Sequence, residues 1–332
     1  MTPAHQTPET DNLMPTPESI SLFHRAAPGQ AGMALVMVLW FIVLLSVISF
    51  GLSSTGRSSA QMAGQLAGSS EARHHADAAM QLVLVNLLSA SEAERLVGDG
   101  SVYRVLGPDA DTHLILWDES GKIDINFASE ELLQRLFSQL ELSGDKSRQL
   151  AGAIADWRDD DDLVRLHGAE SDDYLAAGLT YGPANDKFNN TRELAQVLGM
   201  EADILRAAEP YLTVYTSNSG INPEVAPLLV LLAASEADAT TIENYVKTRQ
   251  ENFLAGLTPP SPPAIPRHFL ATERGITFKL SALATGSRGV RAGQSMVFRL
   301  SREGSGHHLQ TIRRWPYVEA RELYESMERR QQ

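Results

Sequence analysis

The pattern of hydrophobic and polar positions changes sharply at residue 33. From residue 33 to residue 52 no side chain is charged, and no side chain ionises between Arg25 and Arg57. At about 1.5 Å per residue, a helix over this run is long enough to cross the hydrocarbon core of a bilayer. A helix buried in a soluble protein is the alternative, but such helices rarely run this far without a polar face. We therefore predict a membrane anchor that includes Met33, Leu39, Trp40, Leu45 and Leu52.

Helical periodicity continues beyond the anchor to about Leu96. Its apolar positions recur at three- and four-residue spacing, which predicts one face packed on a core. These positions are Met80, Val83, Leu84, Leu87 and Leu88. Five later stretches have the pattern of strands, at residues 101–106, 113–117, 275–283, 294–301 and 309–315. The predicted fold is α+β, with the long N-terminal helix packed on a small antiparallel sheet.

A region of short helices separates the second of these strands from the third, so we predict a helical domain inserted into the sheet. It contains a loose repeat, in which an apolar residue and an Asn precede a capping stretch and a leucine-bearing helix, at residues 125–136, 188–198 and 221–231. Asn, Ser and Thr can accept hydrogen bonds from amides of a first helical turn. The repeat resembles helix-hairpin-helix units, which raises the alternative of a membrane-tethered DNA-binding protein.

The charge of the chain counts against that alternative. The 332 residues carry a formal net charge of −13 at pH 7, whereas nucleic-acid binders usually present a basic face. The hairpin at residues 140–145 lacks the usual Gly-x-Gly turn, and the hairpin at 198–203 places carboxylates where phosphate would lie. We therefore expect no nucleic-acid partner. The chain has no cysteine, which excludes disulfides, thiolate zinc sites and cysteine nucleophiles.

The densest cluster of candidate metal ligands lies in residues 156–174. Carboxylates occupy most of residues 156–162, and Glu170 and Asp173 follow. Such crowding causes self-repulsion unless a cation or solvent screens it, and oxygen ligands without Cys favour Ca2+ over zinc or copper. The spacing is not that of an EF-hand. A solvated acidic turn and a carboxylate pair for glycoside hydrolysis are the alternatives.

The residues ahead of the apolar run resemble the class III leader of pilins and pseudopilins. Residues 1–31 are rich in Pro, Thr and Ser, and Gly32 directly precedes the apolar core. The resemblance implies that a prepilin peptidase cleaves after Gly32 and methylates the new N-terminus at Met33, so the helix stays in the mature protein. Most pilins have glutamate at the fifth mature position, which here is Met37. This difference favours a place at the filament tip. An unrelated single-pass anchor is the alternative.

A longer series of motifs resembles the type II secretion system protein K family, the large minor pseudopilins. The motifs occur in order at residues 118–126, 156–161, 168–174, 181–188, 212–215 and 220–227, and the resemblance spans about residues 29–317. It implies a pilin-like helix and sheet with an inserted helical domain that can hold calcium. It also implies calcium ligands at Asp159, Asp161 and Glu170, with Asp156, Asp173 and Asn185 as further candidates.

We predict from this resemblance a structural assembly protein and not an enzyme. Such a minor pseudopilin forms, with proteins I and J, the tip complex that initiates and caps the periplasmic pseudopilus. Other implied partners are the major pseudopilin, the prepilin peptidase and the inner-membrane assembly platform. The chain would cross the inner membrane of a Gram-negative bacterium once, with its C-terminal domain in the periplasm. The predicted parts are a leader (1–32), an anchor and pilin-type helix (33–98), a sheet in two portions (99–120 and 265–318), a helical insert (121–264) and a tail (319–332).

Overall fold

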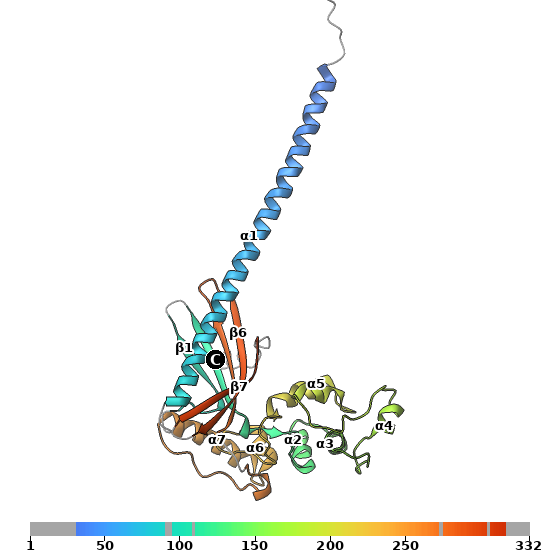
Figure 1. Ribbon diagram of the computed structural model, residues 1–332, viewed down its shortest axis with the longest axis vertical. Coiled ribbons are helices and arrows are strands. Elements are labelled where there is room, and N and C mark those ends of the chain that lie inside the picture. Colours follow the sequence, from blue (N-terminus) through green and yellow to red (C-terminus); the bar gives the residue numbers. More distant parts are fainter. Residues whose placement is uncertain (1–30, 90–94, 108–109, 272–274, 304–305, 317–332) are drawn as a thin grey trace, which may run out of the picture. The chain divides into compact units, whose positions relative to one another are not determined.

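The computed structural model describes residues 31–89, 95–107, 110–271, 275–303 and 306–316. The chain divides into two compact units, Met1–Met62 and Ala63–Gln332, and helix α1 (Ala31–Ser89) contributes to both (Figure 1). The predicted leader, apart from residues 31 and 32, and the predicted tail lie outside the described residues.

The described part of the first unit is the beginning of α1. Met33–Gly51 has a mean hydropathy of 2.8, and none of it is buried. The hydroxyl of Ser46 is satisfied within the helix, because its Oγ donates to the Ile42 carbonyl at 2.7 Å. A helix of this length with apolar side chains exposed along it is suited to hydrocarbon rather than water. This is consistent with the predicted anchor.

The second unit contains a five-stranded antiparallel sheet in the order β1-β2-β5-β6-β7. Its strands are β1 (Asp99–Leu106), β2 (Asp111–Asp118), β5 (Thr277–Thr285), β6 (Arg291–Glu303) and β7 (Gly306–Pro316). All five predicted strands are present. The strand β6 begins earlier than predicted, because its ladder with β5 continues to the pair Thr285 and Arg291.

The later part of α1 packs on one face of this sheet (Figure 1). The predicted core positions Met80, Val83, Leu84 and Leu87 are buried, and Leu88 is half-buried. They join one core with apolar side chains of three strands, among them Leu114, Leu116, Leu280, Met296 and Phe298. The described helix is Ala31–Ser89, and the predicted continuation over residues 90–94 lies outside the described residues; Leu96 itself is not helical. The side chain of Asn86 accepts a hydrogen bond from the Leu96 amide at 2.9 Å.

A mostly helical insert lies between β2 and β5, which are neighbours in the sheet. It begins with a 3-10 turn η2 (Glu119–Gly121) and a short parallel pair of β3 (Ile123–Asp124) and β4 (Leu212–Thr213). Its helices are α2 (Glu130–Gln139), α3 (Gly144–Arg158), α4 (Ser171–Ala176), η3 (Thr191–Gln196), α5 (Ala202–Ala208), η4 (Glu209–Tyr211), α6 (Leu228–Ala234), α7 (Ala239–Leu254) and η5 (Arg267–Phe269). They enclose a second core, which includes Leu132, Leu136, Phe137, Leu150 and Ile154.

Buried polar contacts stabilise the beginning of the insert, where the chain leaves β2. Lys122 Nζ lies 2.7 Å from Glu119 Oε1, with both side chains almost completely buried, and Thr213 donates to the other oxygen of Glu119. Asp118 Oδ2 accepts from the Gly275 amide at 3.0 Å. Because buried charges are tolerated only when they are paired, these contacts fix where the insert leaves the sheet.

The three repeated segments of the insert do not share one capping scheme. Ser129 caps α2 by accepting from the Leu132 amide, and Asn190 caps η3 by accepting from the Arg192 amide. Asn126 and Asn222 make other contacts: Asn126 bonds to Phe188, and Asn222 forms a turn with the Glu224 amide. The α2–α3 pair is a helical hairpin, but Glu141 occupies the left-handed region at its turn (φ 64°), where Gly is the usual residue. The detailed likeness to helix-hairpin-helix units is therefore not supported.

Candidate functional site

The acidic segment connects the end of α3 to the beginning of α4. The backbone becomes extended at Asp159, which is the C-cap of α3, and again at Glu170, which is the N-cap of α4. Asp160, Asp161 and Asp162 lie between them and are exposed. The local fold thus separates the carboxylates into an outer group in solvent and an inner group near the two helix ends.

The inner group consists of Asp156, Asp159, Glu170 and Asn185. Asp156 is completely buried and Glu170 is 6% exposed. Buried oxygens without a hydrogen-bond partner within the described residues are Asp159 Oδ1, Asn185 Oδ1 and both carboxylate oxygens of Glu170, whereas Asp156 Oδ1 lies 3.0 Å from Arg165 Nε. Buried polar atoms are nearly always hydrogen-bonded. Several unbonded acceptors in one small region are therefore the type of donor set that a hard cation uses.

Burial and mutual repulsion disfavour the ionised forms of the inner carboxylates. Burial, followed by the negative charges of Asp156 and Asp159, raises the pKa of Glu170 to about 7. Burial also raises the pKa of Asp156, although a hydrogen bond from the Arg165 amide opposes this. Both shifts reflect anions held near one another with little solvent. A cation placed among them would relieve the repulsion.

Arg165 is the cationic partner of this group, and the sequence analysis did not single it out. Its Nε lies 3.0 Å from Asp156 Oδ1, and a terminal nitrogen lies 2.7 Å from Asp159 Oδ2. Its amide also donates to Asp156 Oδ2 at 3.2 Å. Arg165 is the one Lys or Arg residue between residues 159 and 186, which is the signal that could have identified it.

The two other predicted ligands make local contacts. Asp161 is exposed, and its Oδ1 accepts from the Leu163 amide at 2.9 Å. Asp173 is exposed, and its Oδ2 accepts from the Glu170 amide at 2.9 Å at the start of α4. The structure therefore does not bring Asp161 and Asp173 into the inner group. Asp162 is exposed, and its Oδ1 accepts from Asn185 Nδ2 at 3.1 Å.

An aromatic floor supports the inner group. The Trp157 ring stacks on Phe188 with centroids 5.8 Å apart and meets Tyr174 at 6.2 Å. Gly168 passes so close to Asp156 that a Cβ there would lie 1.8 Å from Asp156 Oδ2, so only glycine fits at this position. These contacts hold Asp156 against the floor and determine which way its carboxylate faces.

The donor chemistry of this site fits calcium. The inner oxygens come from carboxylates and an amide, which Ca2+ accepts as ligands. Within the parts of the chain that the structure describes, no three acidic or histidine side chains stand together as a formed metal site. Arg165 accounts for part of this arrangement, because its guanidinium pairs with two of the carboxylates.

The predicted processing and anchor residues all lie on α1. Gly32 and Met33 are in its first turn, and the side chains of Met33, Leu39, Trp40 and Leu45 are exposed. Leu52 lies within the same helix, but its side chain is outside the described residues. Met37 is also exposed, so the span presents no carboxylate at that position.

Comparison with known proteins links this fold to bacterial secretion. Residues 114–217 match the family model described as type II secretion system (T2SS), protein K. A type II secretion system protein K from Klebsiella pneumoniae is 24% identical over 246 residues, which cover 66% of this chain and 75% of the relative. One from Aeromonas hydrophila is 28% identical over 254 residues, which cover 67% and 76%.

A solved structure has the same fold. It is the GspK-GspI-GspJ complex of the enterotoxigenic Escherichia coli type 2 secretion system, in which the matching chain is 18% identical with a TM-score of 0.55. The match covers 79% of this chain and 99% of that one. At this identity the similarity establishes the arrangement of helix, sheet and insert.

Proposed function

Because the chain belongs to the type II secretion system protein K family, we propose that it is a minor pseudopilin that initiates and caps the periplasmic pseudopilus. The observation that carries this proposal is that one helix, α1, forms both the apolar span and part of the core of the head. Its first part is an exposed apolar span, and its later part packs on the sheet through Met80, Val83 and Leu87. One helix can thus be extracted from the membrane together with the head that it supports.

The partners in this proposal are minor pseudopilins equivalent to those in the GspK-GspI-GspJ complex. Apolar side chains of α1 outside the membrane span support lateral packing against partner helices. Met62, Leu66, Leu82 and Val85 are all more than half exposed. Covering such side chains is favourable in water, and small residues between Gly51 and Gly68 would allow partner helices to approach closely just beyond the membrane span. The major pseudopilin and the inner-membrane platform would meet the same helix.

The place at the tip follows from two features. Met37 has no carboxylate to pair with the N-terminus of a neighbouring subunit, so this subunit does not need a neighbour above it. The insert between β2 and β5 also adds a second core to the head. A head enlarged in this way would block the addition of another subunit. In this proposal, a prepilin peptidase cleaves between Gly32 and Met33, and the head resides in the periplasm.

We further propose that the inner group binds Ca2+. The residues that would hold the ion are Asp156, Asp159, Glu170 and Asn185. The unbonded oxygens of Asp159, Glu170 and Asn185 support this assignment, and Asp156 would bind the ion in place of the Arg165 side chain. Asp161 and Asp173 would join only by releasing the Leu163 and Glu170 amides. When bound, the ion would neutralise the carboxylates and hold the 159–170 segment against the body of the insert.

Co-purification tests the assembly proposal. The full chain is expressed with pseudopilins I and J of its own system and extracted in detergent. A stable heterotrimer is expected, and Leu82→Glu together with Val85→Glu should reduce its yield about tenfold or more, since a charge would enter the interface. Leu254→Glu is the matched control, because Leu254 is an exposed leucine (84%) at the end of α7. Equal yields from both variants would contradict the proposed helix face.

Thermal unfolding of the full chain tests the calcium proposal. Added Ca2+ should raise the midpoint relative to chelator, by the equivalent of about 2–3 kcal/mol at an ion concentration near one hundred times Kd. Asp159→Asn with Glu170→Gln should abolish this increase. Asp160→Asn should preserve it, because Asp160 is exposed and outside the inner group. The same midpoint with chelator and with Ca2+ would refute the proposal.

A further inference from the structure

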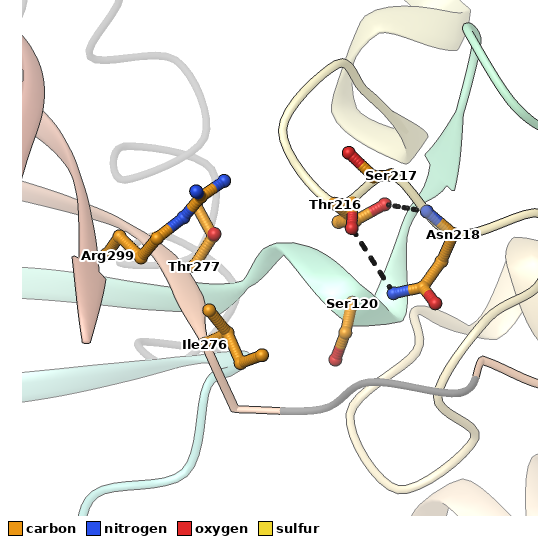
Figure 2. Close-up of a pocket in the computed structure, with 7 residues that line it drawn as sticks. All are labelled: Ser120, Thr216, Ser217, Asn218, Ile276, Thr277 and Arg299. Atoms are coloured by element: carbon orange, nitrogen blue, oxygen red, sulfur yellow. Dashed lines mark hydrogen bonds between the residues drawn. The ribbon is translucent and has the colours of Figure 1, made fainter. Parts of the chain in front are cut away.

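A cavity of about 170 Å3 lies where the sheet meets the insert (Figure 2). Thr277 of β5 and Arg299 of β6 line one side of it. Residues 216–218, which follow β4, line the other side, and Ser120 and Ile276 complete the wall. The cavity is remote in sequence from the acidic segment and shares no residue with it.

The sheet aims Arg299 into this region. Thr277 and Arg299 are directly paired across β5 and β6, so their side chains share one face of the sheet. Their neighbours Phe278 and Phe298 belong to the core beneath α1. Because side chains alternate along a strand, Arg299 faces away from α1 and toward the insert.

Arg299 is the one charged residue on the cavity wall. The described residues give its guanidinium no ion pair or hydrogen bond, and it is exposed. No carboxylate is found among the described residues that line the wall. A positive charge in a small recess without a neutralising wall group attracts an anion.

The opposite wall supplies hydroxyl groups. Ser120 is 4% exposed, and its hydroxyl is directed to the Asp118 carboxylate. Ser217 is exposed. The Thr216 hydroxyl is not available to a guest, because its Oγ1 already donates a hydrogen bond to Asp124 Oδ2 at 3.0 Å. The Ser217 side chain and the Arg299 guanidinium are thus able to donate to a guest.

The loop that presents these groups is held in place. Asp124 Oδ2 accepts from the Thr216 and Ser217 amides at 3.0 and 2.9 Å. These bonds hold Ser217 in the left-handed region (φ 57°), which is unfavourable for a residue other than glycine. The Asn218 amide also donates to Thr216 Oγ1 at 3.3 Å (Figure 2). A guest would therefore meet a preorganised wall.

We propose that this cavity binds a carboxylate group, of the size of an aspartate or glutamate side chain, presented by another protein. The donors suit an oxygen anion, and Ile276 provides an apolar wall for methylene groups. The net charge of −13 disfavours a ligand with several negative charges, which favours a carboxylate over a phosphate. Such a contact would tie a partner to both the sheet and the insert.

Methyl NMR of the full chain in detergent tests the proposal. Sodium acetate and a glutamate blocked at both backbone ends are titrated at constant ionic strength against the Ile276 methyl signal, assigned from Ile276→Val. Both should shift the signal to saturation. Arg299→Gln should weaken binding about tenfold or more, since a charge-assisted contact is lost, and Ser217→Ala should weaken it several-fold.

Arg313→Gln is the matched control, because Arg313 is an exposed arginine on β7 outside the cavity, and it should bind as the natural protein does. Thermal unfolding verifies that each variant is folded. If Arg299→Gln does not fold, Arg299→Lys takes its place in the titration. An equal response to chloride, tighter binding of inorganic phosphate than of acetate, or undiminished binding by the Arg299 variant would overturn the proposal.

Discussion

The side chain of Asn126 forms two hydrogen bonds to the backbone of Phe188, 62 residues further along the chain. Asn126 Nδ2 donates to the Phe188 carbonyl at 2.9 Å, and the Phe188 amide donates to Asn126 Oδ1 at 2.8 Å. Phe188 stacks on Trp157, which follows the buried Asp156. This pair therefore connects the first and second repeated segments and positions the floor of the candidate calcium site.

Replacing Asn126 should loosen that floor. Asn126→Ala removes both bonds and leaves the Phe188 amide and carbonyl without partners, so we expect the free energy of unfolding to fall by about 2 kcal/mol. Urea unfolding measures this. Asn252→Ala is the control, since Asn252 is half-buried and its side chain makes a single, solvent-exposed bond to the Thr258 carbonyl at 2.8 Å; its loss should be about 0.5 kcal/mol or less. Equal losses would contradict a special role for the Asn126–Phe188 pair.

The raised pKa of Glu170 predicts a pH dependence for the calcium-free protein. Its pKa is about 7 in the folded chain, against an ordinary value of 4.5. Between these values the folded state holds a proton that the unfolded state lacks. The resulting stability is fully present below the unfolded value and is lost as pH rises through about 7.

Glu170→Gln removes this titration. The unfolding free energy of the natural chain should decline from pH 5 to pH 8 by about 2 kcal/mol more than that of the variant, as followed by urea unfolding with chelator present. The difference isolates Glu170 from other titrating groups. Parallel profiles for the two proteins would show that Glu170 ionises freely in the fold.

The buried pair of Glu119 and Lys122 predicts that substitutions at the two positions have non-additive effects on the free energy of unfolding. Removing either charge leaves the other uncompensated at a site where both side chains are at most 4% exposed. Glu119→Gln and Lys122→Met should each reduce the unfolding free energy by about 3–5 kcal/mol. The double variant should lose clearly less than the sum of the two. Additive losses in this mutant cycle would mean that the charges do not depend on each other.

The α2–α3 hairpin predicts that DNA does not bind. Glu141 lies at its turn with φ 64°, and Asp145 lies in the first turn of α3, so carboxylates stand where backbone phosphate would approach. No gel shift is expected with duplex DNA at low salt, where electrostatic binding is strongest. A shift that disappears on adding salt would instead support the helix-hairpin-helix alternative.

The resemblance to the type II secretion system protein K family is confirmed by the comparisons, and the α+β fold with an inserted helical domain is confirmed by the structure. The candidate site was predicted only in part. Asp159, Glu170 and Asn185 have unbonded oxygens and Asp156 pairs with Arg165, whereas Asp161 makes only a local contact. All these residues look alike in the sequence, because a row of aspartates does not reveal which of them the fold will bury.

The sequence by itself determined the features that depend on near neighbours. The apolar run from residue 33, the periodicity of Met80 to Leu87 and the alternation in the strands each follow from a repeat that a helix or strand must obey. Tertiary structure decided the features that depend on distant residues. The bonding of Asn126 to Phe188, the pairing of Arg165 with Asp156 and Asp159, and the position of Arg299 opposite Ser217 arise only when separate segments pack, because burial and pairing are properties of the folded chain and not of any local pattern.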